Sequence, residues 1–224
     1  MESEVLGEAG GLRQGRTTPV WSVRNLLSGI FSGASERRKR KHWNARVLEA
    51  VRELERRIPG MTIDVLSDDP VFNTIVSEAD RIALQSREEE KLQALLNTIQ
   101  NCSLPRAPTI SVQTFFLRFL SELTPADLTV LAMLNNPREW FRERSIREDQ
   151  FEFATLRALI QYCLAAVSVR AQSCDQIARS LQSRGLLQQL KFDAVMTRES
   201  LLSPRTTAMG RQFVAYIGKP GQTS

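Results

Sequence analysis

One stretch of the chain, residues 173–217, constrains the fold more than any other. It contains a short amphipathic segment that begins at Ser173 and stops at Gly185, then two short apolar runs around a polar loop, and then a second amphipathic segment. Ser173 and Gln176 have the spacing of a helix capping box, and glycine readily takes the left-handed conformation that ends a helix. This order predicts a helix, a short hairpin and a closing helix.

The first of these predicted helices, residues 173–185, has two chemically different sides. Because successive side chains on a helix are about 100° apart, Cys174, Ile177 and Leu181 fall together on an apolar side. The opposite side carries groups that can form hydrogen bonds. They are Gln176, Arg179, Ser180 and Ser183, flanked by Gln182 and Arg184. This division suits a recognition helix, whose outer side chains meet phosphates or base edges while its inner ones pack on a core.

The chain after this helix predicts the wing of a winged helix. Residues 186–192 would form one short strand, and residues 201–202 would start its return. Residues 193–200 would then be the tip of the wing. Arg198 and Arg205 lie around this tip, where they would meet the phosphates that flank a DNA site.

Two resemblances rest on these residues. The pattern GLL followed by T-x-x-GRxFVxYI, with Thr207, Gly210 and Arg211, resembles the wing and following helix of bacterial winged-helix proteins. Amphipathic helices, then FLSELTPADLTVLAMLNNP, GLL and GRQF, occur in this order over roughly residues 36–217. That order is similar to the one in the abortive-infection alpha family of bacterial proteins. The resemblance implies a role in phage defence and brings no catalytic residues with it.

The first half of the chain predicts three amphipathic helices. The first covers residues 35–58, the second opens at Asp68, Asp69 and Pro70, and the third is capped by Ser86. After the segment LTPADL, in which Thr124 and its neighbours form a capping-box-like pattern, a charged connector is expected. An apolar helix from about residue 151 to residue 169 follows it. Strand-like alternation is scarce, so the pattern is typical of an α-rich protein.

Prolines divide the chain into the expected domains. Two prolines between residues 101 and 108 predict a linker, with an N-terminal helical region at 19–101 and a winged-helix-like domain at 109–218. Residues 1–18 and 219–224 are expected to be disordered tails. The predicted fold class is mostly α: an N-terminal helical region followed by a winged-helix-like C-terminal half with a short two-stranded wing.

The net charge of +5 is unevenly distributed along the chain. Residues 36–57 carry nine lysines and arginines against four glutamates, whereas residues 58–101 carry three against eight acidic residues. Such asymmetry predicts either an internal pairing of basic and acidic segments or a basic face for an anionic partner. Solvated helix faces are the simpler interpretation.

Five cations gather in the first turns of the helix predicted over residues 35–58. Their charges oppose the positive end of the helix dipole, which costs some stability. An anionic partner would relieve that cost, and the alternative is a hydrated, frayed run. We call this group the cation run: Arg37, Arg38, Lys39, Arg40 and Lys41.

A short apolar segment, residues 20–31, precedes the cation run. Together the two would suit an anionic membrane surface, because the apolar patch could enter the headgroup region beside the cations. Packing of the segment on the protein body is the simpler alternative, since twelve residues with two serines and a glycine make a weak anchor.

No residue pattern indicates catalysis, a metal site or a cofactor. His42 is the only histidine, and it follows the cation run without a nearby nucleophile. No glycine-rich phosphate loop, metal-ligand spacing or nucleophile elbow occurs. The three cysteines, Cys102, Cys163 and Cys174, lack a CxxC spacing and predict reduced thiols in a cytoplasmic protein. No apolar run is long enough to predict a transmembrane helix.

These patterns predict a non-enzymatic binding protein whose winged helix contacts duplex DNA or a partner protein, and the resemblance implies a role in bacterial phage defence. Residues 173–224 carry seven lysines and arginines against three acidic residues, which permits duplex binding without requiring it. The alternative is a defence effector on the membrane surface that uses residues 20–41, cytoplasmic and peripheral to the inner membrane. A homodimer is compatible with either. The predicted contact residues of the winged helix are Gln176, Arg179, Ser183, Arg184, Arg198 and Arg205.

Overall fold

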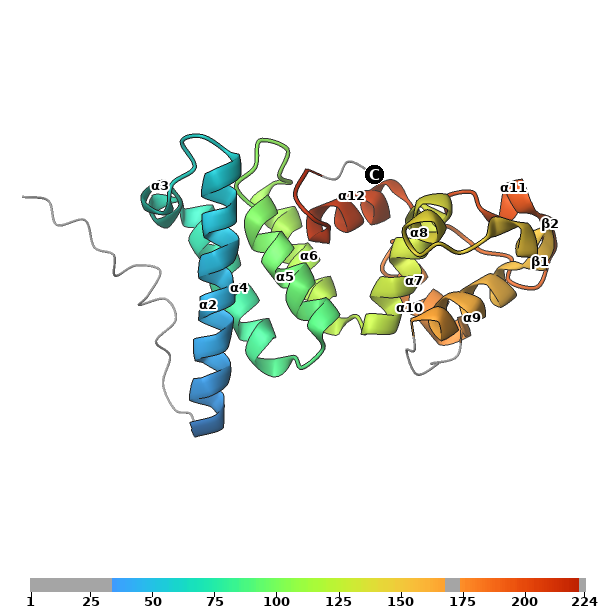
Figure 1. Ribbon diagram of the computed structural model, residues 1–224, viewed down its shortest axis with the longest axis horizontal. Coiled ribbons are helices and arrows are strands. Elements are labelled where there is room, and N and C mark those ends of the chain that lie inside the picture. The colour runs from blue at the N-terminus through green and yellow to red at the C-terminus, as the bar shows by residue number, and fades with distance from the viewer. Residues whose placement is uncertain (1–33, 168–173, 222–224) are drawn as a thin grey trace, which may run out of the picture.

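The computed structural model describes residues 34–167 and 174–221. The tail predicted at residues 1–18, the apolar segment at 20–31 and the predicted cap Ser173 lie outside the described residues. Helices form most of the described chain, together with one small antiparallel sheet. Figure 1 shows an elongated arrangement, with α2–α6 at one end and the two strands at the other. The mostly α character that the sequence predicts is confirmed.

The N-terminal half is a set of helices packed around one another. They are α2 (Ala34–Arg57), α3 (Ile63–Asp68), α4 (Pro70–Gln85), α5 (Glu89–Asn101) and α6 (Ile110–Glu122). The helix predicted over residues 35–58 is confirmed as α2, which packs against α4 and α5. α4 also begins as predicted: the Asp69 carboxylate accepts a hydrogen bond from the Val71 amide at 2.8 Å, and Pro70 takes the first helical position.

Two helix starts differ from the prediction. Ser86 does not cap α5, because its hydroxyl donates to the Ile82 carbonyl at 2.9 Å at the end of α4. α5 begins at Glu89, with Glu88 in the cap position and no hydrogen bond from the cap side chain. The short α3, capped by the side chain of Thr62, was not predicted. Its six residues are too few to show an apolar period.

The proline-bearing linker between α5 and α6 returns the chain to the same group of helices. α6 packs against α4 and α5, so it lies with the N-terminal helices although it follows the predicted boundary. The Gln113 side chain of α6 donates to the carbonyls of Cys102 at 3.2 Å and Pro108 at 2.8 Å, which ties the linker to the helix. The division into independent units at 19–101 and 109–218 remains a prediction.

The C-terminal half contains shorter elements. They are α7 (Pro125–Asn135), α8 (Pro137–Glu143), η1 (Glu148–Phe151), β1 (Phe153–Thr155), α9 (Leu156–Ala166), α10 (Cys174–Ser183), β2 (Val195–Thr197), α11 (Arg198–Leu201) and α12 (Ala208–Ile217). The capping box of α7 is confirmed, since the Asp127 carboxylate accepts the Thr124 amide at 2.8 Å and the Thr124 hydroxyl accepts the Asp127 amide. The predicted charged connector contains two short helices, α8 and η1. Trp140 and Phe141 of α8 are buried.

The apolar helix predicted over residues 151–169 begins later, because β1 takes part of that segment. Thr155 ends the strand and caps α9, with its hydroxyl accepting the Ala158 amide at 3.2 Å. β1 pairs antiparallel with β2, so that Phe153 lies opposite Thr197. A pairing between segments far apart in the sequence therefore decides where this helix starts.

The predicted wing differs from a free hairpin. Its two flanks meet only at the base, where Leu187 bridges to Thr206 and the Gln188 amide donates to the Arg205 carbonyl at 3.0 Å. The predicted tip, residues 193–200, supplies β2 and the start of α11. The return strand predicted at Leu201 is wrong, because that residue is buried in α11 while β2 pairs with β1.

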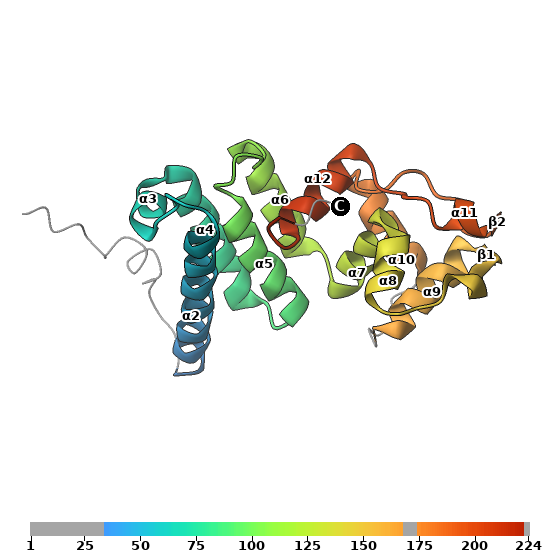
Figure 2. The same ribbon diagram turned by 45° about the horizontal axis from the view of Figure 1, so that its top comes forward.

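A continuous hydrophobic core runs through the described chain from α2 to α12. α12 joins the two halves: it packs against α5 and α7, and Figure 2 shows it between them. Phe213 of α12 meets Phe116 and Phe119 of α6 edge-on, at ring-centroid distances of 5.2 Å and 5.9 Å. These contacts place α12 as a shared part of both halves.

The end of α12 and the chain after it are also tied to the N-terminal helices. The Asn97 side chain of α5 donates to the Ile217 carbonyl at 2.9 Å, and Arg57 of α2 donates to the Pro220 carbonyl at 2.7 Å. Part of the tail predicted at residues 219–224 is therefore held against α2.

Candidate binding surfaces

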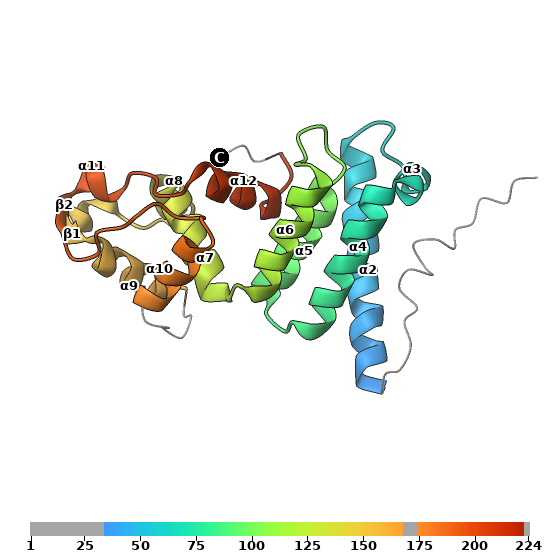
Figure 3. The ribbon, with the colours of Figure 1, turned by 180° about the vertical axis from the view of Figure 1, so that it is seen from behind.

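α10 has the two-sided character that the sequence predicts. Its inner side chains Ile177 and Leu181 are fully buried, whereas Gln176, Arg179 and Ser183 are exposed. We call these three residues the outer face of α10. Figure 3 shows α10 at the surface beside α9, with no helix or strand of the described chain across it. The outer face is therefore accessible to a ligand in this conformation.

The Thr-x-x-Gly-Arg motif holds the turn that follows α10. Gly185 has the predicted left-handed conformation, with φ of 69°. The Thr207 hydroxyl donates to the Gly185 carbonyl at 2.6 Å, and the Thr207 amide donates to the Leu186 carbonyl at 3.1 Å. Gly210 lies so close that a Cβ atom there would be 2.1 Å from the Leu186 carbonyl oxygen. The motif thus positions α10 against the start of α12.

Arg184, predicted to flank the outer face, is bound within the protein. Its guanidinium donates to Glu122 of α6 at 3.0 Å and to the Ser180 carbonyl at 2.9 Å. Arg118 also donates to Glu122, at 3.2 Å. Hydrogen bonds from Arg118 and Arg184 lower the pKa of the Glu122 carboxyl. The charge of Arg184 is therefore already shared with an acidic partner.

The two predicted wing arginines have partners as well. The Arg205 guanidinium donates to the Ser200 carbonyl, and the Arg205 amide donates to the Leu134 carbonyl at 2.8 Å. Arg198 lies in the first turn of α11 and forms an ion pair with Glu199 at 3.6 Å. The structure places both arginines around α11 and not on a free loop.

Sequence reasoning missed Arg157, which neutralises acidic groups next to α10. This arginine of α9 donates to Asp193 at 2.7 Å and lies 3.2 Å from Asp175. The hydrogen bond with Asp193 and then the one with Asp175 raise the pKa of the guanidinium. The acidic partners follow Arg157 by 36 and 18 residues, so no local pattern predicts the pairing.

The cation run lies at the start of α2. Four of its side chains are exposed: Arg37, Arg38, Lys39 and Lys41. Arg40 is half-buried and forms an ion pair at 3.3 Å with Asp80 of α4, so it is not one of the exposed cations. This end of α2 projects beyond the turn between α4 and α5, as Figures 1 and 3 both show. The structure therefore concentrates the four exposed cations at one tip of the molecule.

The cysteines of the described chain are buried thiols. Cys102, Cys163 and Cys174 form no disulfide. Burial raises the pKa of the Cys102 and Cys163 thiols to about 12, so neither is a thiolate nucleophile near neutral pH. No group of three or more His, Cys, Asp and Glu side chains within the described ranges could hold a metal ion. None of the helices in those ranges has the length and apolar character needed to cross a bilayer.

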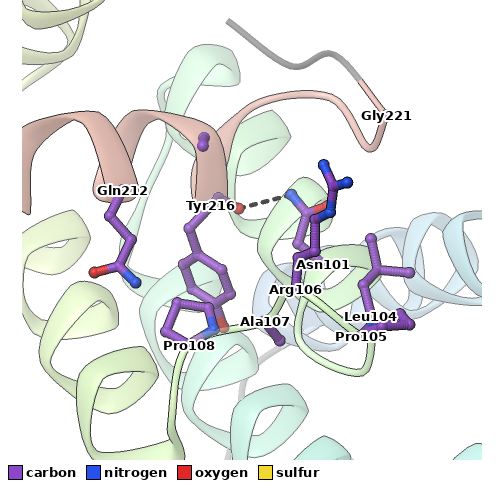
Figure 4. Close-up of a pocket in the computed structure, with 10 residues that line it drawn as sticks. Asn101, Leu104, Pro105, Arg106, Ala107, Pro108, Gln212, Tyr216 and Gly221 are labelled. Atoms are coloured by element: carbon purple, nitrogen blue, oxygen red, sulfur yellow. Dashed lines mark hydrogen bonds between the residues drawn. The ribbon is translucent and has the colours of Figure 1, made fainter.

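A mostly apolar cavity of about 330 Å³ lies where the linker, residues 104–108, meets α12 (Figure 4). The Tyr216 hydroxyl donates to the Gln113 side chain at 2.7 Å, and the Asn101 side chain donates to the Tyr216 carbonyl at 2.8 Å. Burial raises the pKa of Tyr216. Because these polar groups are already paired, we interpret this cavity as a packing gap at the contact between the two halves of the chain. Its residues are far apart in the sequence, so no motif indicated it.

Comparison with models of protein families, with curated proteins and with solved structures found no match for this chain. The resemblance to bacterial winged-helix proteins and to the abortive-infection alpha family rests on the residues of the sequence and remains a prediction. The geometry of α10 and of the start of α2 is what bears on function.

Proposed function

We propose that the C-terminal half is a winged-helix-like, non-enzymatic binding module that contacts a partner protein through the outer face of α10. The order α7, β1, α9, α10 and β2, with β1 antiparallel to β2, supports the winged-helix interpretation. The main observation in support of this function is that α10 has two chemically different sides. One side of this helix is buried in the core, and the other presents hydrogen-bonding groups to solvent.

Duplex DNA fits the surroundings of α10 less well, because several arginines there already hold partners within the protein. Neutralisation of phosphates supplies most of the non-specific affinity of a protein for DNA. Arg179 is exposed and has no ion pair with another described residue. The arginines that have partners within the protein are Arg157, Arg184, Arg198 and Arg205. These arginines are therefore less free to reach phosphates than the sequence alone suggests.

An apolar pair on the small sheet supports a protein partner. Phe153 of β1 and Val195 of β2 are 73% and 70% exposed. The register of the two strands puts both side chains on the same side of the sheet. Exposed aromatic and aliphatic side chains that lie together are typical of protein interfaces.

Photocrosslinking in the host cell tests this proposal. A photoreactive phenylalanine analogue replaces Ser183 on the outer face or, as a matched control, the exposed Thr114 on α6. We expect a discrete crosslinked species from position 183 that is absent at position 114 and lost when Arg179→Ala is added. A species of twice the chain mass would identify a second copy as the partner. Equal products at both positions, or none at position 183, would contradict the proposal.

Salt-titrated binding of a fluorescent DNA duplex separates the two partner classes. We expect weak binding that the Arg179→Ala variant changes little. Binding that falls steeply with salt and is lost in Arg179→Ala would instead favour DNA as the ligand of α10.

The exposed cation run supports a second candidate function, binding to an anionic membrane surface. Its four exposed cations lie at a projecting helix end, where they can approach lipid headgroups without moving the rest of the protein. The ion pair between Arg40 and Asp80 holds this end of α2 against α4. The surface thus combines exposed positive charge with a fixed position.

Vesicle flotation tests this second function. We expect the protein to float with phosphatidylcholine vesicles that contain phosphatidylserine and not with phosphatidylcholine alone. Replacement of all four exposed cations by glutamine should abolish flotation, and removal of residues 1–33 measures what that segment adds. Absence of flotation with the anionic vesicles would exclude this function.

A role in phage defence is what the resemblance to the abortive-infection alpha family supports. Plating efficiency of phages on cells that produce the protein tests it, with the Arg179→Ala variant as the comparison. We expect protection by the unchanged protein only. Equal plaque numbers with and without the protein would contradict a role against those phages.

A further inference from the structure

A second, smaller cavity lies between the early turns of α2 and the turn that joins α4 to α5. Its volume is about 230 Å³. Its walls combine cationic and apolar groups: Lys39, Arg46 and Arg87 with Trp43, Leu84 and Leu92. Binding through α10 does not use this cavity, because α10 belongs to the other half of the molecule. The cation run shares Lys39 with the cavity, but attraction of the run to a surface requires no cavity.

Trp43 provides a buried hydrogen-bond donor in the cavity wall. Its side chain is 4% exposed, and its Nε1 atom has no hydrogen-bond acceptor among the residues that the structure describes. An indole N–H can only donate, and nearly all buried donors in proteins have an acceptor. Trp43 lines the cavity, so an oxygen acceptor bound there would satisfy this group once a small shift of the indole ring exposes the Nε1 atom.

Three cations supply the charge of the cavity. Arg46 is held by two hydrogen bonds to Glu89, at 3.0 Å and 2.5 Å. The side chains of Lys39 and Arg87 are exposed and have no hydrogen bond or ion pair with another described residue. Glu88 is engaged by the backbone amide of Arg87 at 3.0 Å. The backbone amides of Arg87 and Glu88 and, more weakly, the charges of Lys91 and Arg87 lower the pKa of the Glu88 carboxyl. The side chains of Lys39 and Arg87 stay exposed to an anion.

The helix ends at the cavity do not by themselves select the sign of a ligand. α4 ends there, and its dipole presents a negative end, whereas α5 begins there and presents a positive end. The two contributions oppose each other. The side chains around the cavity consequently decide its preference, and they favour an anion.

We propose that this cavity binds a phosphate monoester. A phosphate dianion offers several acceptor oxygens, which match the separate donors of Lys39, Arg87 and the Trp43 indole. The apolar wall formed by Leu84 and Leu92 accommodates a small organic group attached to the phosphate. The volume of the cavity limits the ligand to a small phosphorylated molecule or to the headgroup of a phospholipid.

Nuclear magnetic resonance of the indole N–H groups in the full chain tests the proposal with glycerol 3-phosphate as the probe. We expect the Trp43 resonance to shift and to saturate on titration, while the Trp140 resonance stays in place. The Trp43→Phe variant identifies the peak. A Trp43 resonance that does not move with glycerol 3-phosphate or with the lipid probe below would overturn the proposal.

Two charge variants distinguish specific binding of the phosphate in the cavity from non-specific electrostatic attraction to the surface. Lys39→Gln with Arg87→Gln should weaken binding by about tenfold or more, because the two positive charges that face the phosphate are lost. Arg37→Gln with Lys41→Gln removes the same charge from exposed positions outside the cavity and should leave the affinity nearly unchanged. Equal weakening by the two variants would contradict the cavity site while leaving the surface function of the cation run intact.

Bilayer nanodiscs that contain phosphatidic acid provide the second arm of the experiment. A Trp43 shift with the nanodiscs alone identifies a lipid headgroup as the source of the phosphate. A shift with glycerol 3-phosphate alone identifies a soluble ligand. Inorganic phosphate added to either arm should compete, because the anion is the shared element of both ligands.

Discussion

Gly210 is a residue whose role depends on a single close approach. A Cβ atom at this position would lie 2.1 Å from the Leu186 carbonyl oxygen, so any larger residue must displace the backbone. We expect Gly210→Ala to lower the free energy of unfolding by about 1–3 kcal/mol. Urea denaturation measures this change, with Met209→Ala at the exposed neighbouring position as the control. Equal stability of Gly210→Ala and the unchanged protein would contradict the observed packing.

Asp80 gives the stability of the protein a specific dependence on pH. Burial raises the pKa of its carboxyl, and the charge of Arg40 opposes this shift only in part. The folded state then keeps the proton at pH values where the unfolded chain has lost it. We therefore expect the contribution of Asp80 to the free energy of unfolding to fall as the pH rises from the ordinary aspartate range through the raised pKa.

The Asp80→Asn variant isolates this contribution, because asparagine does not titrate. Urea denaturation of both proteins at a series of pH values gives the difference in their free energies of unfolding. This difference, unchanged protein minus variant, should decrease with rising pH across that window. A difference that is constant or that increases would show that the Asp80 pKa is not raised.

Single residues could be predicted where their own chemistry decides their role. The left-handed conformation of Gly185 and the cap at Asp69 follow from local rules of helix ends. The partners of Arg184 and Arg40 could not be predicted in this way. They lie 62 and 40 residues away, and only the packing of helices brings them together.

At the scale of elements, the two threonine caps of α6 and α7 provide a matched test. Thr124 forms a complete capping box with Asp127, whereas the side chain of Thr109 makes no capping hydrogen bond to α6. We expect Thr124→Ala to cost about 1 kcal/mol of stability. Thr109→Ala should cost less, because it removes no such bond. Thermal unfolding measures both, and equal losses would contradict the difference between the caps.

Long amphipathic helices were predictable and short elements were not. α2 and α4 contain several turns of regular apolar spacing, so their bounds follow closely from the pattern. β1 has three residues, and its partner lies beyond the next two helices. Asn136 ends α7 and at the same time caps α8 through its side chain. The pair Asn136 and Pro137 therefore marks the end of one helix and the beginning of the next.

At the scale of the whole molecule, two buried tryptophans report on the two halves. Trp43 lies in α2 and Trp140 in α8. Because α12 packs against both α5 and α7, we expect the two halves to unfold together. Variants with a single tryptophan, obtained by replacing the other two with phenylalanine, should show the same urea midpoint by fluorescence.

The Asn101→Ala variant extends this experiment to the contact between the two halves. Asn101 donates to carbonyls in and after the last turn of α12, at Tyr216 and Gly218. Loss of these bonds should lower both midpoints by the same amount. Separate midpoints in the unchanged protein would instead show that residues 19–101 and 109–218 fold independently, as the prolines of the linker predict.

The position of α12 also has a consequence for synthesis on the ribosome. α5 and α6 emerge long before α12, since about a hundred residues separate Gln113 from its partner Tyr216. During that interval the aromatic side chains of Phe116 and Phe119 lack the ring of Phe213 that covers them in the finished protein. We therefore expect the nascent N-terminal helices to expose an aromatic, hydrophobic surface that chaperones can bind until translation has passed α12.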